Sequence, residues 1–234
     1  MHSGVWLDFA KLLAKSDRVT CIDLPGHGQS EKLDHFTLET ISDVLIRSVP
    51  DEASCWLGWS LGSSVALTIA NRYPERCSSL ILLAGNPHFV RTDRWPGINL
   101  PVLNAFADSL SIDGQATLLR FLSLQINGLP NYKELAITLK AAISQYPAPD
   151  HDTLLQGLQI LKASDLRPAL AQLKIPVSVL LGSNDTLVPA AVGHSMQQLL
   201  PQLELNSIDR AGHVPFLSHQ AQVVDIISRF MDKQ

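Results

Sequence analysis

The stretch Trp56–Ser64, WLGWSLGSS, places Ser60 between two glycines at the junction of two apolar runs. The preceding run, Ala53–Leu57, predicts a short buried strand, and Ser63–Tyr73 predicts a helix. A turn this tight strains the serine backbone, and we expect a side chain at either glycine to collide with neighbouring backbone. The turn would expose a hydroxyl at a helix N-terminus, where backbone N–H groups stabilise negative charge.

Gly58 to Gly62 forms the pattern G-x-S-x-G, which is typical of the nucleophile turn of α/β-hydrolases. Taken alone, the pattern is equally well read as a glycine-rich turn with an incidental serine. A hydrolase of this kind also needs a carboxylate and a histidine downstream, in that order along the chain. The rest of the sequence therefore has to supply both groups at the same edge of a sheet.

Predicted strands alternate with predicted helices over most of the chain. The expected strands are Arg18–Leu24, Ala53–Leu57, Ser79–Ala84, Pro176–Leu181 and Glu204–Ile208. The expected helices are Val5–Ala14, Thr37–Arg47, Ser63–Tyr73, Pro189–Leu200 and Gln220–Lys233. Because the strands are almost entirely apolar, we expect an α/β-hydrolase fold with a mostly parallel sheet and helices on both faces.

Residues 91–167 interrupt this alternation with four helical patterns and no convincing strand. The patterns cover Leu100–Leu110, Gln115–Ile126, Tyr132–Gln145 and Thr153–Lys162. We expect a helical cap inserted between two pieces of the core, residues 1–90 and 168–234. Such an insertion would lie over the carboxyl edge of the sheet, where open α/β sheets bind ligands.

Asp185 and His213 are the candidates for the acid and the base. Asp185 follows a predicted strand. Taken alone, it is equally well explained as a turn-capping aspartate after Asn184. His213 lies in a Gly/Pro loop after the last strand, and of the eight histidines it alone has the required order and position. Together they predict a triad in which His213 takes the Ser60 proton, Asp185 holds the imidazole, and water cleaves an acyl-enzyme.

Composition argues against several other classes of protein. A net charge of −4 gives no basic face for nucleic acid, and no apolar run has the length of a membrane span. The first residues do not read as a signal peptide. The cysteines Cys21, Cys55 and Cys77 fit no metal spacing and are expected as buried, reduced thiols. We expect a cytoplasmic monomer with no metal, no organic cofactor and no nucleic acid or membrane partner.

Several stretches together carry a more specific resemblance. They are WLGWSLGSSVA, RWPGI (Arg94–Ile98), RFLSLQ (Arg120–Gln125), LQGLQILKASDLR and AGHVPFLSH. From about Val5 onward the chain resembles the pimeloyl-[acyl-carrier protein] methyl ester carboxylesterases of biotin biosynthesis. The resemblance implies removal of the methyl ester from pimeloyl-carrier protein, which ends chain elongation and frees the distal carboxyl group of the biotin precursor.

The resemblance also implies roles for particular residues. It gives the triad to Ser60, Asp185 and His213, and one oxyanion-binding N–H to Leu61. The cap segment that lines the acyl channel corresponds to Phe121, Leu122, Ser123, Leu124 and Gln125. By their own pattern, these five residues equally predict a helix packed on the sheet. An acidic acyl-carrier protein is expected to contact Arg120 and Lys133, which are otherwise ordinary solvated charges.

The chain departs from the family pattern at its start. The family begins with strands that end in His-Gly-Trp, whose tryptophan N–H is the second oxyanion donor, and no such loop occurs here. The absent strand would lie between the predicted strands Arg18–Leu24 and Ala53–Leu57. We therefore expect an N-terminally incomplete core: either the true start lies upstream, or the sequence is a fragment. An active, stable chain that begins at Met1 is the less favoured alternative.

Two other functions remain open. A broad hydrolase of small esters, a lactonase or a carbon–carbon hydrolase would share the fold and triad, and would prefer short soluble esters without gain from a carrier protein. A binding protein or inactive remnant of the hydrolase fold would account for the missing oxyanion loop. The presence of Ser60, Asp185 and His213 argues against that last reading.

Overall fold

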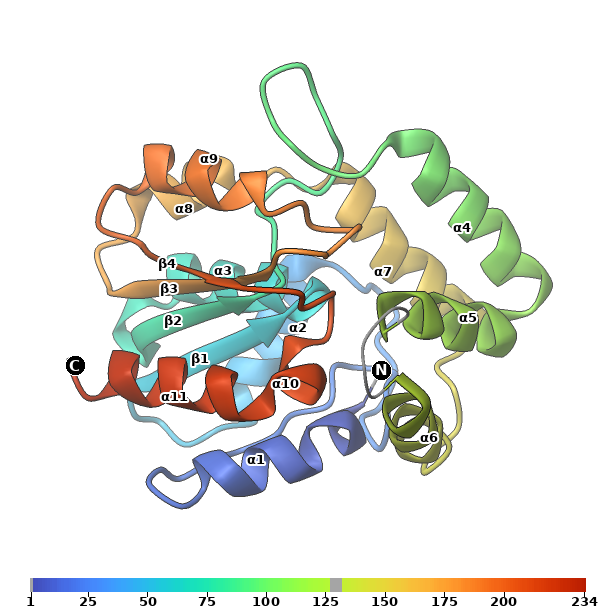
Figure 1. Cartoon of the computed structure of the whole chain (residues 1–234), viewed down its shortest axis with the longest axis horizontal. Helices are drawn as coiled ribbons and strands as arrows, with labels where there is room; N and C mark the ends of the chain where they lie inside the picture. Colours follow the sequence, from blue (N-terminus) through green and yellow to red (C-terminus); the bar gives the residue numbers. More distant parts are fainter. Residues whose placement is uncertain (1, 127–131) are drawn as a thin grey trace.

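The computed structural model describes residues 2–126 and 132–234, without the side chains of Gln115, Leu122, Leu124 and Gln125. Four parallel strands form one sheet in the order β1-β2-β3-β4 (Figure 1). They are β1 (Ser54–Trp59), β2 (Cys77–Leu83), β3 (Val177–Gly182) and β4 (Glu204–Ile208). All four lie within two residues of the predicted apolar runs, which confirms the expected parallel sheet.

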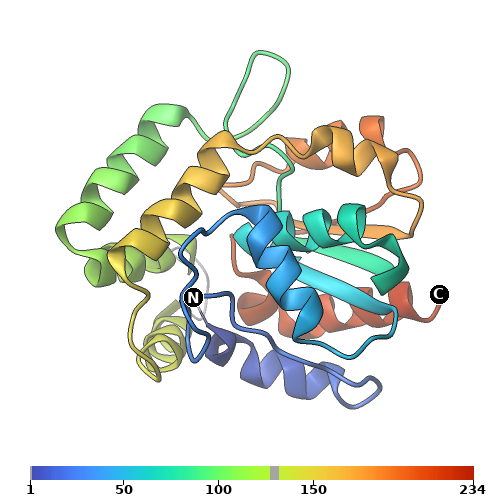
Figure 2. The same cartoon turned by 180° about the vertical axis from the view of Figure 1, so that it is seen from behind.

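Helices cover both faces of the sheet (Figures 1 and 2). One face carries α1 (Leu7–Leu13), α10 (Pro215–Ser218) and α11 (Gln220–Met231); a 3-10 turn, η1 (Ser3–Trp6), precedes α1. The other carries α3 (Leu61–Arg72), α8 (Arg167–Gln172) and α9 (Ala191–Leu199), with α2 (Leu38–Arg47) packed outside α3. Successive β2 side chains alternate between the two cores, since neighbouring residues of a strand point to opposite faces.

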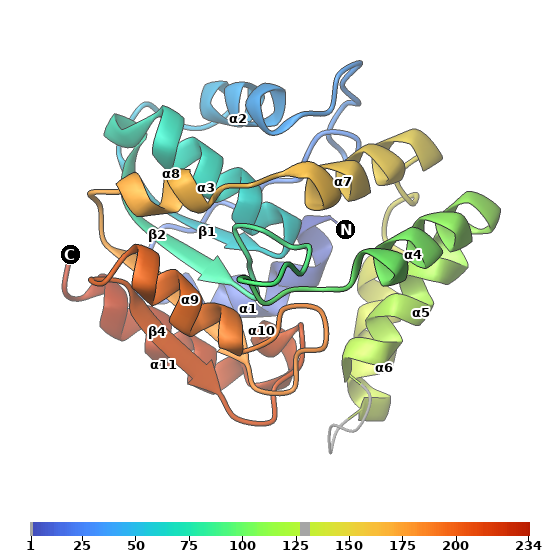
Figure 3. The ribbon, with the colours of Figure 1, turned by 90° about the horizontal axis from the view of Figure 1, so that it is seen from above.

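Four further helices lie beside the core at the carboxyl ends of the strands (Figure 3). They are α4 (Leu100–Ile112), α5 (Gly114–Ile126), α6 (Tyr132–Ile143) and α7 (His151–Ala163). Within the described part of residues 91–167, the β contacts are isolated bridges, such as Thr92 with Trp95. The helices therefore occur where the sequence predicts them, while the division into core and cap at residues 90 and 168 stays a prediction.

The predicted strand Arg18–Leu24 is wrong. Residues 18–24 pair with none of the described strands, and residues 18–22 line the same cavity as β1, the edge strand of the sheet. Their apolar character signals contact with a core, but a strand also needs a neighbouring backbone to pair with, and the local sequence cannot supply one. Cys21 in this segment is exposed rather than buried.

No helix in the described ranges is both long enough and apolar enough to cross a lipid bilayer.

Candidate active site

Ser60 sits on a strained turn between β1 and α3. Its φ of 55° and ψ of −120° lie in a region that non-glycine residues rarely adopt. Two hydrogen bonds hold the turn: Ser60 N–H donates to the Leu83 carbonyl at 3.1 Å, and Ser63 Oγ donates to the Gly58 carbonyl at 2.6 Å. The hydroxyl is thereby presented at the carboxyl end of the strand.

The two glycines of the turn are not equivalent. A Cβ at Gly58 would lie 2.2 Å from the Gly62 carbonyl oxygen, so only glycine fits where β1 meets α3. A Cβ at Gly62 would meet no atom within 4 Å. The expectation of a collision at both glycines is therefore right for Gly58 and wrong for Gly62, where the space for a Cβ is open.

We expect Gly58→Ala to destabilise the protein by about 3 kcal/mol or more, because the clashing atom belongs to the backbone and cannot rotate away. Gly62→Ala is the matched control, and we expect it to be neutral or to stabilise the protein by about 0.5–1 kcal/mol through helix propensity. Urea unfolding of both variants measures the difference. Equal midpoints for the two variants would contradict this view of the turn.

The structure brings Ser60, His213 and Asp185 together. His213 Nε2 lies 2.9 Å from Ser60 Oγ, and His213 Nδ1 lies 2.8 Å from Asp185 Oδ2. The second carboxylate oxygen, Oδ1, accepts the N–H groups of Leu187 and Val188 at 2.8 and 3.0 Å. The His213 and Asp185 side chains are 1% and 0% exposed. The carboxylate thus favours a proton on Nδ1 and leaves Nε2 to accept the serine proton.

Two loops at the ends of neighbouring strands carry Asp185 and His213. Asp185 follows β3 and His213 follows β4, and Asn184 N–H joins the loops by donating to the Ala211 carbonyl at 2.9 Å. Gly182 permits this approach, since a Cβ there would lie 2.3 Å from the Ala211 carbonyl oxygen. The parallel register of β3 and β4 therefore places the two side chains together.

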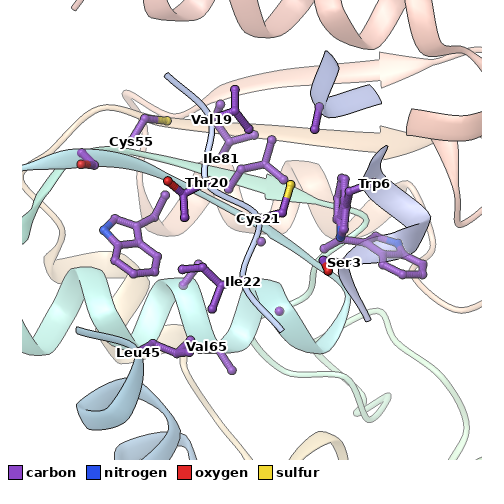
Figure 4. Close-up of a pocket in the computed structure, with 18 of the residues that line it drawn as sticks. Ser3, Trp6, Val19, Thr20, Cys21, Ile22, Leu45, Cys55, Val65 and Ile81 are labelled. Atoms are coloured by element: carbon purple, nitrogen blue, oxygen red, sulfur yellow. The ribbon is translucent and has the colours of Figure 1, made fainter. Parts of the chain in front are cut away.

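A cavity of about 650 Å³ opens beside Ser60. Its walls include Leu61, His213, Leu118 and Phe121 as well as residues 18–22 and β1. Figure 4 shows Val19, Thr20, Cys21 and Ile22 running along this cavity, with Trp6 and Ser3 at one end and Cys55 towards the other. The serine hydroxyl thus faces a volume with mainly apolar walls.

Of the residues expected to line the acyl channel, one lines the cavity and another does not. Phe121 lines the cavity, and its ring lies 6.4 Å from the His213 ring. Ser123 does not line it: its side chain is exposed, and its hydroxyl donates to the Leu119 carbonyl. The positions of the Leu122, Leu124 and Gln125 side chains lie outside what the structure describes.

The two expected carrier-protein contacts, Arg120 on α5 and Lys133 on α6, are both exposed.

Leu61 is the first residue of α3 and lines the cavity, as expected for an oxyanion donor. Its N–H belongs to the first turn of the helix, where amides have no intrahelical acceptor. Two other amides near the cavity are engaged: Ser3 N–H donates to Asp23, and Gly4 N–H donates to His2 Nδ1 at 3.1 Å. Neither provides the second donor in this arrangement.

An aromatic cluster behind His213 was missed from the sequence. Trp59 lies 5.1 Å from Phe216 between ring centres, and Trp6 stacks on Phe216 at 4.1 Å. The available signal was a tryptophan inside G-x-S-x-G, directly before the serine. The cluster gives the His213 loop a rigid apolar support.

Serine hydrolases of α/β architecture bring a serine, a histidine and a carboxylate to one sheet edge in this chain order. The chain belongs to the alpha/beta hydrolase fold family, whose model matches residues 1–220.

Within this family, the chain is 42% identical to a protein of Methylococcus capsulatus named pimeloyl-[acyl-carrier protein] methyl ester esterase, over 99% of this chain and 91% of that one. A protein of the same name from Serratia marcescens is 36% identical over 99% of this chain and 90% of its own length.

Solved structures show the same fold. An esterase from Exiguobacterium antarcticum matches with a TM-score of 0.86 at 19% identity, over 98% of this chain and 88% of that one. The enol-lactonase of Burkholderia xenovorans matches with a TM-score of 0.85 at 19% identity, over 99% and 87% of the two chains.

Proposed function

We propose that this chain is a serine carboxylesterase that hydrolyses the methyl ester of pimeloyl-[acyl-carrier protein] in biotin biosynthesis. The observation that carries the ester chemistry is the 2.9 Å approach of His213 Nε2 to Ser60 Oγ, with Asp185 on the other imidazole nitrogen. The choice of ester is supported by the relatives of that name at 36–42% identity.

The reaction proceeds through an acyl-enzyme. Ser60 Oγ attacks the ester carbonyl while His213 Nε2 takes its proton, and Leu61 N–H donates to the oxyanion. The histidine then gives this proton to the departing methoxide, which leaves as methanol. His213 next deprotonates water, which attacks the acyl-serine; the proton returns to Ser60 Oγ and the free carboxylic acid is released. Asp185 stabilises the imidazolium in both halves of the reaction.

The cavity and the cap supply the substrate contacts. The apolar walls beside Ser60, including Leu118 and Phe121, suit the methylene chain of a pimeloyl group. We place residues 91–167 as a cap on a core of residues 1–90 and 168–234, with Arg120 and Lys133 as cationic contacts for the acidic carrier. The chemistry calls for no metal or organic cofactor. We propose a cytoplasmic monomer, a location supported by cysteines that form no disulfide.

Mass spectrometry of the carrier protein tests this function. Incubation with pimeloyl-carrier-protein methyl ester should remove one methylene unit of mass from the acyl group, and Ser60→Ala should abolish the change. Free dimethyl pimelate, assayed beside it, should be a poorer substrate. Added salt should raise KM for the carrier-linked ester alone, because exposed charges are screened. Equal turnover of both esters, or turnover of small aryl esters alone, would replace this proposal by the broad esterase.

A further inference from the structure

The base of the triad is held through its backbone as well as through its ring. Trp59 Nε1–H donates to the His213 main-chain carbonyl at 2.7 Å, across 154 residues of sequence. Trp59 is the last residue of β1 and directly precedes Ser60. Two adjacent residues therefore contact the same histidine, Trp59 at its carbonyl and Ser60 at its imidazole.

The indole has little freedom to leave this position. Its ring packs edge-on against Phe216 at 5.1 Å and against Trp6 at 6.1 Å, while Trp6 stacks on Phe216. Phe216 is fully buried and belongs to α10, which directly follows the His213 loop. The Trp59 indole is thus held at the end of β1, next to Ser60. The Phe216 ring that packs against it belongs to α10, directly after the His213 loop.

The His213 carbonyl lies in a loop with little regular structure to hold it. It precedes α10, whose first backbone bonds run to the carbonyls of Val214 and Pro215. Pro215, two residues further on, has no N–H to donate. Among the described contacts, the tryptophan is the partner that ties this carbonyl to the rest of the site.

We propose that Trp59 is a positioning residue for His213. Its indole N–H fixes the histidine backbone so that Nε2 stays within hydrogen-bond distance of Ser60 Oγ through both proton transfers. The proposal rests on the proposed hydrolase chemistry but not on the identity of the ester. Because Trp59 also lines the cavity, the competing role is that of a wall for the substrate.

The chain offers a matched control on the same strand. Trp56 Nε1 also donates to a main-chain carbonyl, that of Arg76, at 3.1 Å. Trp56→Phe and Trp59→Phe thus each remove one indole-to-carbonyl hydrogen bond from β1. Both indoles also line the cavity, so the variants differ in whether the lost carbonyl partner belongs to His213.

Steady-state hydrolysis of p-nitrophenyl butyrate separates the roles. For Trp59→Phe we expect kcat to fall about tenfold with KM within twofold of the parent, because misplacement of a catalytic group lowers the rate and not the binding. Trp56→Phe should keep the parental kcat whatever its effect on KM, because its indole lines the cavity but bonds to the Arg76 carbonyl and not to His213. A rise in KM at constant kcat, or equal behaviour of the two variants, would overturn the proposal. A parent protein without esterase activity would instead overturn the proposed function.

Two further measurements exclude a general loss of packing. Replacing Trp59 by β-(3-benzothienyl)alanine keeps the fused ring and removes the N–H, and it should reproduce the tenfold fall in kcat. The far-downfield proton signal of the His213–Asp185 hydrogen bond should broaden in both Trp59 variants and remain sharp in Trp56→Phe. Full activity of the benzothienyl variant with an unchanged proton signal would also overturn the proposal.

Discussion

Replacing Ser60 by alanine is expected to lower kcat for ester hydrolysis by roughly 10⁶, because the variant cannot form the acyl-enzyme. His213 would still lie at the sheet edge, but Nε2 would face a methyl group instead of a hydroxyl. What remains is the modest acceleration from binding and oxyanion stabilisation. Electrospray mass spectrometry adds a direct readout, since a fluorophosphonate should label the parent chain once and leave Ser60→Ala unlabelled.

Ser123→Ala is the matched serine control. Its hydroxyl is exposed and donates back to the Leu119 carbonyl of its own helix, so the variant should keep parental kcat and labelling. Circular dichroism and thermal melting show whether Ser60→Ala keeps the fold. More than one per cent of parental activity in a folded Ser60→Ala protein would rule out Ser60 as the nucleophile.

Asp185→Asn should lower kcat by about 10⁴ while leaving the structure almost unchanged. The asparagine oxygen can still accept the N–H groups of Leu187 and Val188, which places its NH₂ group against His213 Nδ1. The amide then donates to Nδ1 and forces the ring proton onto Nε2, so the imidazole no longer accepts the Ser60 proton.

Asp113→Asn serves as the control for this change. The Asp113 carboxylate also accepts a backbone N–H, that of Ala116, but it lies between α4 and α5 and is exposed. Its asparagine variant should keep parental kcat and melting temperature. If Asp185→Asn lost less than tenfold in kcat, the carboxylate would be a structural turn residue and not a member of the triad.

The strands, and the approach of Ser60, His213 and Asp185 to one another, were predictable because their signals are local. SLILLA and PVSVLL are continuous apolar runs, as expected of strands buried on both faces, and both form strands. Asp185 and His213 follow the ends of β3 and β4, and the carboxyl ends of parallel strands meet at one edge. Chain order and strand ends were therefore sufficient to bring three distant residues together.

The errors arose where the outcome depends on distant partners. Arg18–Leu24 has the composition of a strand, yet strand formation depends on a neighbouring backbone elsewhere in the fold. Ser123 lies two residues from Phe121, but the helical turn places its side chain on another side, away from the cavity. The bond from Trp59 to the His213 carbonyl spans 154 residues and has no local signature beyond the tryptophan itself.

At position 60, selection for activity and selection for stability favour different residues because of the backbone conformation. Its φ of 55° and ψ of −120° carry a cost of about 1–3 kcal/mol for a residue with a Cβ, which glycine would largely avoid. A screen for heat resistance alone would therefore favour glycine at position 60, and the selected protein would lack the proposed nucleophile. Directed evolution of a thermostable form needs activity as a simultaneous criterion, or a library that holds this position constant.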